Sequence, residues 1–310
     1  MVPTEYLAGF VDGEGYLGLA RIPRRNGARE YCIRVSIYNT HRPVMDEIRA
    51  TWGGTISIVA RNLPVWKPSY ALIWTNAAAA RLIRKVAPFL VVKSRQAEAL
   101  IAFDERVQAG RRSRDPKGRL LPLSAVEIRV REDIYRRLKQ LNRRGAGSHR
   151  LNLNENHLTP LAKLSAKYVA GFIDAEGSLM ITRARVMGSR TYQFRPRISV
   201  ANTRRDVLEA IQRSFGGILA GQPARDPAWS HSYQLIWTEG TVRPLLSSVT
   251  KHLIVRAQQA RILSQFIRQR TRASRARTGR TFQARPASNL DLQEVLRGRI
   301  RKLNRRGLSR

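Results

Sequence analysis

Two short apolar segments, one near the start of each half of the chain, have the spacing of a buried helix. Residues 7–11 form the first segment, and residues 169–173 repeat its pattern of apolar positions. Thr159 followed by Pro160 has the form of an N-cap and a first helical residue. We therefore expect the second of these helices to begin there.

After the first apolar segment, apolar and polar residues alternate strictly along the chain. Tyr31, Ile33, Val35 and Ile37 alternate with polar or small residues, which predicts a strand with one apolar and one polar face. The rest of this half predicts a helix at about 41–51 closed by Gly53 and Gly54, strands at about 55–61 and 69–75, and a helix at about 77–108 with breaks near Pro88. The fold class predicted is α+β, with an αββαββα order and one four-stranded antiparallel sheet.

The same order is written twice in the chain. Four blocks recur, at 6–15 and 168–177, at 34–56 and 197–219, at 70–75 and 233–238, and at 141–145 and 303–307. A displacement of this size equals a small domain, so the pattern indicates a duplicated and fused domain with pseudo-twofold symmetry. The predicted domains are 1–148 and 161–310, joined by a polar linker at 149–160 that is rich in Asn. One chain then supplies what a homodimer would, and we expect a monomer.

The charge of the chain points to an anionic partner. Lys and Arg together number 57 against 22 Asp and Glu, a formal net charge of +35, and only nine of the 57 are Lys. The planar guanidinium of Arg matches phosphate and guanine edges better than an ammonium does, so nucleic acid is favoured over an anionic membrane. A GC-rich genome would explain the ratio of Arg to Lys but not the net charge.

Other classes of protein are disfavoured. Cys32 is the only cysteine, and the five His do not cluster, so a disulfide scaffold and a structural zinc site are excluded. The longest stretch without Lys, Arg, Asp or Glu, residues 68–80, is too short to span a bilayer. Acidic residues interrupt a signal-peptide pattern near the N-terminus. We expect no membrane partner and an intracellular protein, in the cytoplasm or nucleoid of a prokaryote, with an organelle as the alternative.

The two apolar helices end in acids. Gly9 and Gly13 lie four residues apart on the first helix, and the second helix has small residues at the equivalent places, so another backbone could approach each helix closely. If the two helices pack on these stripes, Glu14 and Glu176 at their ends must converge. Two such carboxylates would need cations, and Mg²⁺ is the natural hard partner.

LAGFVDGEG at 7–15 and VAGFIDAEG at 169–177 resemble the two signature motifs of the LAGLIDADG homing endonucleases in their single-chain, two-repeat form. The resemblance extends to the PFLVVK sequence at 88–93 and to the LNRRG sequences at 141–145 and 303–307. It implies a DNA-binding saddle built from the two sheets. It also implies Mg²⁺-dependent hydrolysis of phosphodiester bonds in both strands of a double-stranded DNA target.

The resemblance assigns the catalytic positions. Glu14 and Glu176 would bind two or three Mg²⁺ ions with the carbonyl oxygens of Gly13 and Ala175; Mn²⁺ would substitute, and Ca²⁺ would bind without supporting cleavage. Asp12 and Asp174 are expected to be structural, satisfying backbone donors at the helix end or packing at an interface. An exposed charge at a helix end is the alternative for either Glu.

Two further pairs of residues fall at positions where members of this family carry polar side chains. Lys93 and Arg256 would stabilise the scissile phosphates, and because Arg does not deprotonate, the two strands would be cut at different rates. Plain phosphate contacts are the alternative for this pair. Asn39 and Asn202 would position solvent, and turn capping is their alternative.

DNA recognition is predicted on the polar strand faces and on the duplicated LNRRG loops. A two-stranded ribbon fits the major groove, where each base pair has its own hydrogen-bond pattern. The predicted base readers are Arg24, Arg34, Arg61, Lys67, Thr182, Gln193, Arg195, Arg197 and Arg225, and the predicted phosphate contacts are Arg143, Arg144, Arg305 and Arg306.

The two strand faces differ between the repeats. Cys32 aligns with Arg195 and Glu30 with Gln193, so the target is expected to be long and at most pseudo-palindromic. The function predicted is a site-specific double-strand DNA homing endonuclease encoded in an intron or a similar mobile element. Two alternatives are an RNA maturase that assists splicing of its host intron, with intron RNA as a partner, and a cleavage-inactive DNA-binding relative.

Overall fold

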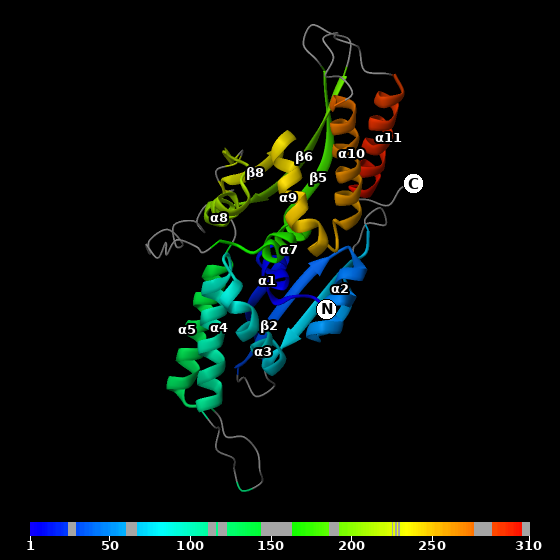
Figure 1. Cartoon of the computed structure of the whole chain (residues 1–310). Coiled ribbons are helices and arrows are strands. Elements are labelled where there is room, and N and C mark those ends of the chain that lie inside the picture. The colour runs from blue at the N-terminus through cyan, green and yellow to red at the C-terminus, as the bar shows by residue number, and fades with distance from the viewer. Residues whose placement is uncertain are drawn as a thin grey trace. The chain divides into compact units, whose positions relative to one another are not determined.

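The structure is a computed structural model of the whole chain, in which two units have the same architecture (Figure 1). It describes residues 1–23, 29–59, 67–110, 116, 123–143, 163–185, 192–224, 226, 228, 230–275 and 287–305. The two compact units correspond largely to the two halves of the sequence. Within the described residues, every helix is too short or too polar to span a bilayer.

The first repeat begins with the helix that carries the motif and continues through one sheet to three further helices. Its elements are α1 (Thr4–Glu14), β1 (Gly15–Pro23), β2 (Arg29–Asn39), α2 (Arg42–Trp52), β3 (Thr55–Val59), β4 (Ser69–Thr75), α3 (Asn76–Val86), η1 (Ala87–Phe89), α4 (Ser94–Ala109) and α5 (Ala125–Leu141).

The second repeat has the same order of elements, with one additional 3₁₀ turn before α9. Its elements are α7 (Ala166–Glu176), β5 (Gly177–Arg185), β6 (Tyr192–Asn202), α8 (Arg205–Phe215), β7 (Ile218–Gln222), β8 (Ser232–Thr238), η3 (Glu239–Thr241), α9 (Val242–Val249), η4 (Thr250–His252), α10 (Ala257–Arg275) and α11 (Ala287–Leu303).

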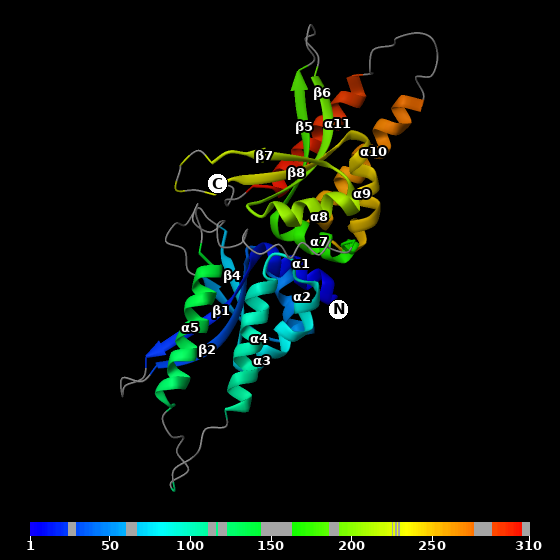
Figure 2. The same cartoon turned by 90° about the vertical axis from the view of Figure 1, so that its left-hand side faces the viewer.

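Each repeat contains one antiparallel sheet with helices against one face. The strand orders are β1-β2-β4-β3 and β5-β6-β8-β7. In the first repeat α4 and α5 lie side by side against β1, and in the second α10 and α11 lie side by side against β5 (Figures 1 and 2). The predicted α+β class, with a four-stranded antiparallel sheet in each repeat, is confirmed.

Alternation along the strands separates the two faces of each sheet. In the first sheet the register aligns Leu19 with Ile33 and Val35 with Trp74, and all four side chains are buried. The predicted apolar face of the strand at 30–38 is therefore correct. We call the opposite side of each sheet its polar face; it carries Arg34 in the first repeat and residues 193, 195 and 197 in the second.

A double glycine ends α2, and another ends α8, for a steric reason. Gly53 and Gly54 have φ angles of 70° and 96°, a region that side chains with a Cβ rarely adopt. A Cβ on Gly54 would also lie 2.8 Å from the indole of Trp74. That indole donates a hydrogen bond to the carbonyl oxygen of Trp52, the last residue of α2. The glycines thus allow the helix end to pack directly on the sheet.

The predicted start of the second motif helix is wrong. The second motif helix begins at Ala166 rather than at Pro160, and Ser165 is its N-cap, with its Oγ accepting a hydrogen bond from the N–H of Tyr168. A Ser can satisfy a helix-end donor as Thr does, so Thr159 was not the only candidate cap. Thr159, Pro160 and the predicted linker at 149–160 lie outside the described residues.

The predicted break near Pro88 in the helix at 77–108 is confirmed, because the segment forms two helices, α3 and α4. Pro88 lies in η1, and residues 90–93 then separate η1 from α4, because Pro cannot continue an α-helical hydrogen-bond ladder. Each repeat also ends in a further helix, α5 or α11, that the predicted αββαββα order lacks. The duplicated LNRRG sequences begin at the last residue of each of these two helices.

Candidate active site and nucleic-acid interface

Each motif helix stops abruptly at its glutamate, and a strand begins at the next residue. Gly15 donates its backbone N–H to the carbonyl oxygen of Val11, and a Cβ on Gly15 would lie 2.5 Å from that oxygen. Gly177 stands equally close to the carbonyl oxygen of Ile173. Only a glycine fits directly after the acid, so the last letter of the motif fixes Glu14 at the point where α1 gives way to β1.

Asp12 binds a loop that comes much later in the sequence. Its carboxylate accepts hydrogen bonds from the N–H groups of Val91 (2.7 Å) and Lys93 (2.9 Å), and it is only 1% exposed. In the second repeat Asp174 accepts from the N–H groups of Ile254 (2.6 Å) and Arg256 (2.8 Å), and also from Val255. The expected structural role, satisfying backbone donors, matches this geometry, although the donors belong to the loop rather than to the helix end.

These bonds position the predicted cationic residues within each repeat. Lys93 is anchored by its backbone to Asp12, and its ammonium also donates a hydrogen bond to the carbonyl oxygen of Asp12. That carbonyl lies two residues before Glu14 in the chain. Arg256 is anchored to Asp174 through its backbone. Each motif helix therefore carries its acid and holds the loop with the corresponding cation.

The electrostatics at the end of each motif helix favour a cation. The C-terminal end of a helix carries about half a negative charge, and acids there are disfavoured unless positive charge lies nearby. Neither α1 nor α7 has a basic residue in its last turn, yet each has two acids there. Glu14 is half-buried and Glu176 is exposed.

Carboxylate and backbone carbonyl oxygens are the donor set that Mg²⁺ prefers, so Glu14, Glu176 and the carbonyls of Gly13 and Ala175 suit this ion chemically. Within the described residues there is no group of three or more His, Cys, Asp and Glu that could hold a metal. A carboxylate completed by a carbonyl oxygen of its own repeat and by water needs no such group.

Asn39 and Asn202 occupy equivalent turns at the ends of β2 and β6. The side-chain Oδ1 of Asn39 accepts a hydrogen bond from the N–H of His41 (2.8 Å), and that of Asn202 accepts one from the N–H of Arg204 (2.9 Å). These bonds correspond to the turn-capping alternative. The role of the two residues in positioning solvent stays a prediction.

The polar face of the second sheet collects four predicted DNA-binding residues. Thr182 is paired with Arg195 and Ala184 with Gln193 in the register of β5 and β6, and Arg197 lies one alternation further along β6. Arg195 is exposed, and its Nη2 donates a hydrogen bond to Oε1 of Gln193 at 2.8 Å. Arg197 Nη2 donates to Gln234 on β8 at 3.3 Å.

The polar face of the first sheet is built differently. Arg34 pairs with Gly18 across β1 and β2, and the hydroxyl end of Tyr16 lies over Gly18, where a Cβ would clash with it. Partial burial raises the pKa of Tyr16, while the neighbouring charge of Arg34 acts in the opposite direction. Lys67 is half-buried just before β4; Arg24, Arg61 and Arg225 lie outside the described residues.

The duplicated LNRRG sequences end α5 and α11 at equivalent points. Asn142 donates its side-chain N–H to the carbonyl oxygen of Leu17 on β1, and Asn304 donates to that of Leu179 on β5, both at 2.8 Å. The next residues, Arg143 and Arg305, are exposed. The Asn thus holds each exposed Arg beside the first strand of its sheet. Arg144 and Arg306 lie outside the described residues.

Sequence reasoning missed several polar residues near these surfaces. His41, for which the sequence suggested no role, is the N-cap of α2, with Nδ1 accepting a hydrogen bond from the N–H of Val44. Glu239 forms ion pairs with Arg195 and Arg270 and also escaped notice. Its sequence neighbours contain no motif, and Arg270 is distant in the sequence, so only the fold brings the three together.

The comparisons with known proteins agree with these features. Residues 169–236 match the model of the LAGLIDADG endonuclease family. The chain matches no curated protein. It is similar to several solved structures along nearly its whole length.

Three of these structures illustrate the similarity. I-AabMI bound to uncleaved DNA is 18% identical, with a TM-score of 0.62, and 96% of this chain and 98% of that one are covered. I-LtrWI bound to target DNA is 12% identical, with a TM-score of 0.62 and 96% of both chains covered. I-SmaMI bound to cleaved DNA is 12% identical, with a TM-score of 0.59, and covers 98% of this chain and 99% of that one.

The fold is that of the two-repeat LAGLIDADG meganucleases, with a four-stranded antiparallel sheet in each repeat. Residues 169–236 match the LAGLIDADG endonuclease family, the family that the two motifs resemble, and the solved structures show the same fold along nearly the whole chain.

Proposed function

We propose that this protein is a site-specific endonuclease that cuts both strands of a long, asymmetric double-stranded DNA target with the help of Mg²⁺. The observation that carries the proposal is the duplicated arrangement of an acid and an anchored cation. Glu14 and Glu176 end equivalent helices, and each helix holds the loop that bears Lys93 or Arg256 through an Asp.

The catalytic assignment follows from this arrangement. Glu14 and Glu176, with the carbonyl oxygens of Gly13 and Ala175, would hold the metal ions. Mg²⁺ bound there would lower the pKa of a coordinated water and neutralise charge on a phosphodiester. Lys93 and Arg256 would place positive charge against the scissile phosphates. Asn39 and Asn202 would position solvent through the part of each amide that the turn does not use.

Recognition of DNA is supported by the polar faces of both sheets and by the net charge of +35. The similar structures of I-LtrWI and I-AabMI are described as bound to DNA, and one of I-SmaMI as bound to uncleaved DNA in the presence of calcium ions. Because the two polar faces carry different residues, the two halves of the target should differ. The protein would act as a monomer, encoded within an intron or similar mobile element.

The test is cleavage of a randomised double-stranded DNA library, with Mg²⁺, with Ca²⁺ and with EDTA. The variant Glu14→Gln with Glu176→Gln keeps the shape of both side chains and removes their charge. The expected result is cutting of one long site in Mg²⁺ only, reduced at least about 1,000-fold in the double variant, with binding in Ca²⁺ retained.

The matched control is Glu47→Gln with Glu209→Gln, which removes two exposed or partly exposed carboxylates from α2 and α8. Control and wild type should cut alike. Absence of cutting by the wild type, together with tight and salt-sensitive binding to intron RNA, would favour a maturase. Sequence-specific DNA binding without cutting would instead favour a cleavage-inactive relative.

A further inference from the structure

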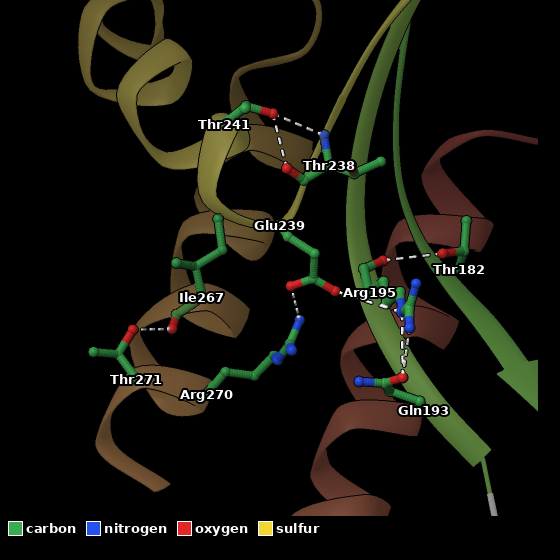
Figure 3. Close-up of polar contacts among 9 residues, drawn as sticks. All are labelled: Thr182, Gln193, Arg195, Thr238, Glu239, Thr241, Ile267, Arg270 and Thr271. Carbon is green, nitrogen blue, oxygen red and sulfur yellow. Dashed lines mark hydrogen bonds and ion pairs between the residues drawn. The ribbon is translucent and has the colours of Figure 1, made fainter. Parts of the chain in front are cut away.

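An ion-pair network links the polar face of the second sheet to a helix that packs against the other face (Figure 3). Glu239, at the first residue after β8, lies between two Arg side chains. Its Oε2 is 2.8 Å from Nη1 of Arg270 on α10, and its Oε1 is 3.6 Å from Nε of Arg195 on β6. Arg195 in turn donates from Nε and Nη2 to Oε1 of Gln193.

The backbone at Glu239 is in an unfavourable conformation for this residue type. Its φ angle is 45°, in the left-handed region that Asn and Gly adopt more readily than Glu. The equivalent residue in the first repeat is Asn76, also with φ of 45°. A Glu where Asn is the easier choice indicates that its carboxylate is retained for another reason.

Two threonines hold the strained turn in place. Thr241 Oγ1 accepts a hydrogen bond from the N–H of Thr238 at 3.0 Å and donates one to the carbonyl oxygen of Thr238 at 2.8 Å (Figure 3). The first repeat has Ala78 at the position equivalent to Thr241, and α3 begins at Asn76, directly after β4, without a 3₁₀ turn. The additional bonds in the second repeat therefore fix the direction in which the Glu239 side chain leaves the backbone.

The network belongs to the second repeat alone. The residues equivalent to Arg195, Glu239 and Arg270 are Cys32, Asn76 and Val107, which cannot form it. A feature needed for the fold would be expected in both copies, since their sheets have the same strand order and register. The network is therefore expected to contribute to a property in which the two repeats differ. The residues on the polar faces of the two sheets are one such difference.

We propose that Glu239, held by Arg270, is a positioning residue that orients Arg195 to recognise a guanine in the half of the target bound by the second repeat. This inference rests on the proposed function. Gln193 occupies the edge of the guanidinium formed by Nε and Nη2, and within the described residues Nη1 has no partner. The outer edge, Nη1 and Nη2, then faces the bases in the geometry that binds O6 and N7 of guanine.

The carboxylate contributes in two ways. It limits the rotamers of a long side chain that is about half exposed, and thereby lowers the entropy that Arg195 loses on binding. It also offsets part of the charge of Arg195, so that a bare phosphate is a weaker competitor for the guanidinium than a guanine edge with defined geometry.

The experiment is selection of bound sequences from a randomised double-stranded DNA library in Ca²⁺, with the base preference at every position compared between variants. Wild type should prefer guanine at one position by about tenfold or more, the discrimination of one bidentate contact. Arg195→Gln should abolish that preference. Glu239→Asn, which places the residue of the first repeat in the left-handed turn, should weaken it at least about threefold at the same position, with no loss of melting temperature.

Glu209→Gln is the matched control, because it removes one carboxylate from α8 in the same repeat, where Glu209 pairs with Arg205. It should leave every base preference unchanged. The inference is overturned if Glu239→Asn leaves the guanine preference intact. It is also overturned if Arg195→Gln weakens binding to all sequences evenly and lowers the salt dependence, as a phosphate contact would. A wild type that selects no DNA sequence would instead overturn the proposed function itself.

Discussion

The helix layers of the two repeats occupy the same place in the fold and use different polar chemistry. In the first repeat Glu127 accepts hydrogen bonds from Arg106 (2.9 Å) and from Arg131 (2.7 Å), which joins α4 to α5 by charge. At the positions equivalent to the two Arg, the second repeat has Gln269 and Gln293. Their Oε1 atoms are buried without a hydrogen-bond partner among the described residues.

The anchoring bonds of the motif helices show the opposite behaviour. Asp12 and Asp174 each bind the equivalent loop of their own repeat. Asn142 and Asn304 each bind the first strand of their own sheet. Features that the two copies share are therefore those that place the acids, the cations and the exposed Arg of the LNRRG sequences. Features that differ concern helix packing and the polar faces of the sheets. The shared features are those that the proposed chemistry requires, and the differing features are those that can vary between the two repeats.

The largest effect is expected from removing an anchoring carboxylate. Asp12→Ala and Asp174→Ala each leave at least two buried or half-buried N–H groups unsatisfied, at about 1–3 kcal/mol for each group. Urea unfolding should show a loss of about 3 kcal/mol or more for each variant. Asp133→Ala, at an exposed position of α5, is the surface control. Equal, small losses for all three variants would contradict the shared anchoring role.

The second-largest loss of stability is expected from substitutions in the double glycines that both repeats share. Gly54→Ala introduces both an unfavourable φ angle and a Cβ that meets Trp74, whereas nothing lies within 4 Å of a Cβ on Gly53. We expect a loss of about 1 kcal/mol for Gly53→Ala and of about 2–3 kcal/mol for Gly54→Ala, measured by thermal unfolding. Gly217→Ala against Gly216→Ala should show the same order in the second repeat. A larger loss of stability for Gly53→Ala than for Gly54→Ala, or for Gly216→Ala than for Gly217→Ala, would contradict this expectation.

The sheet and the motif helices could be predicted from the sequence because their patterns are local. The alternation at residues 30–38 and the double glycines each depend on neighbours in the chain, and the duplication shows every signal twice. The predicted start of α7 was wrong because a second possible capping residue, Ser165, lies closer to the motif than Thr159 does. The residue equivalent to Ser165 in the first repeat is Pro3, which is the N-cap of α1. The two motif helices therefore begin at equivalent positions.

The candidate site was predictable only in part. The acids were recognisable from the motif, but the hydrogen bonds that anchor Lys93 to Asp12 join residues about 80 positions apart, and spacing alone does not reveal them. The network of Arg195, Glu239 and Arg270 was missed for the same reason. Helix α5 was missed because charged residues interrupt its apolar positions, and its buried face includes a charged residue, Arg131.

The smallest effect concerns the charged helix layer of the first repeat. Partial burial alone would raise the pKa of Glu127, but the hydrogen bonds from Arg131 and Arg106 outweigh it and hold the pKa below its ordinary value. A carboxyl whose pKa is lowered by folding stabilises the native state above its unfolded pKa of about 4.3 and loses that contribution as the pH falls through the folded value. Glu127→Gln should therefore cost about 1 kcal/mol at pH 7 and progressively less below about pH 4. The exposed Glu98 of α4 supplies the control, Glu98→Gln. Since the second repeat has amides at the equivalent Arg positions, a pH-independent cost for Glu127→Gln would show that packing rather than charge joins α4 to α5, and the contrast between the two helix layers would then lose its physical basis.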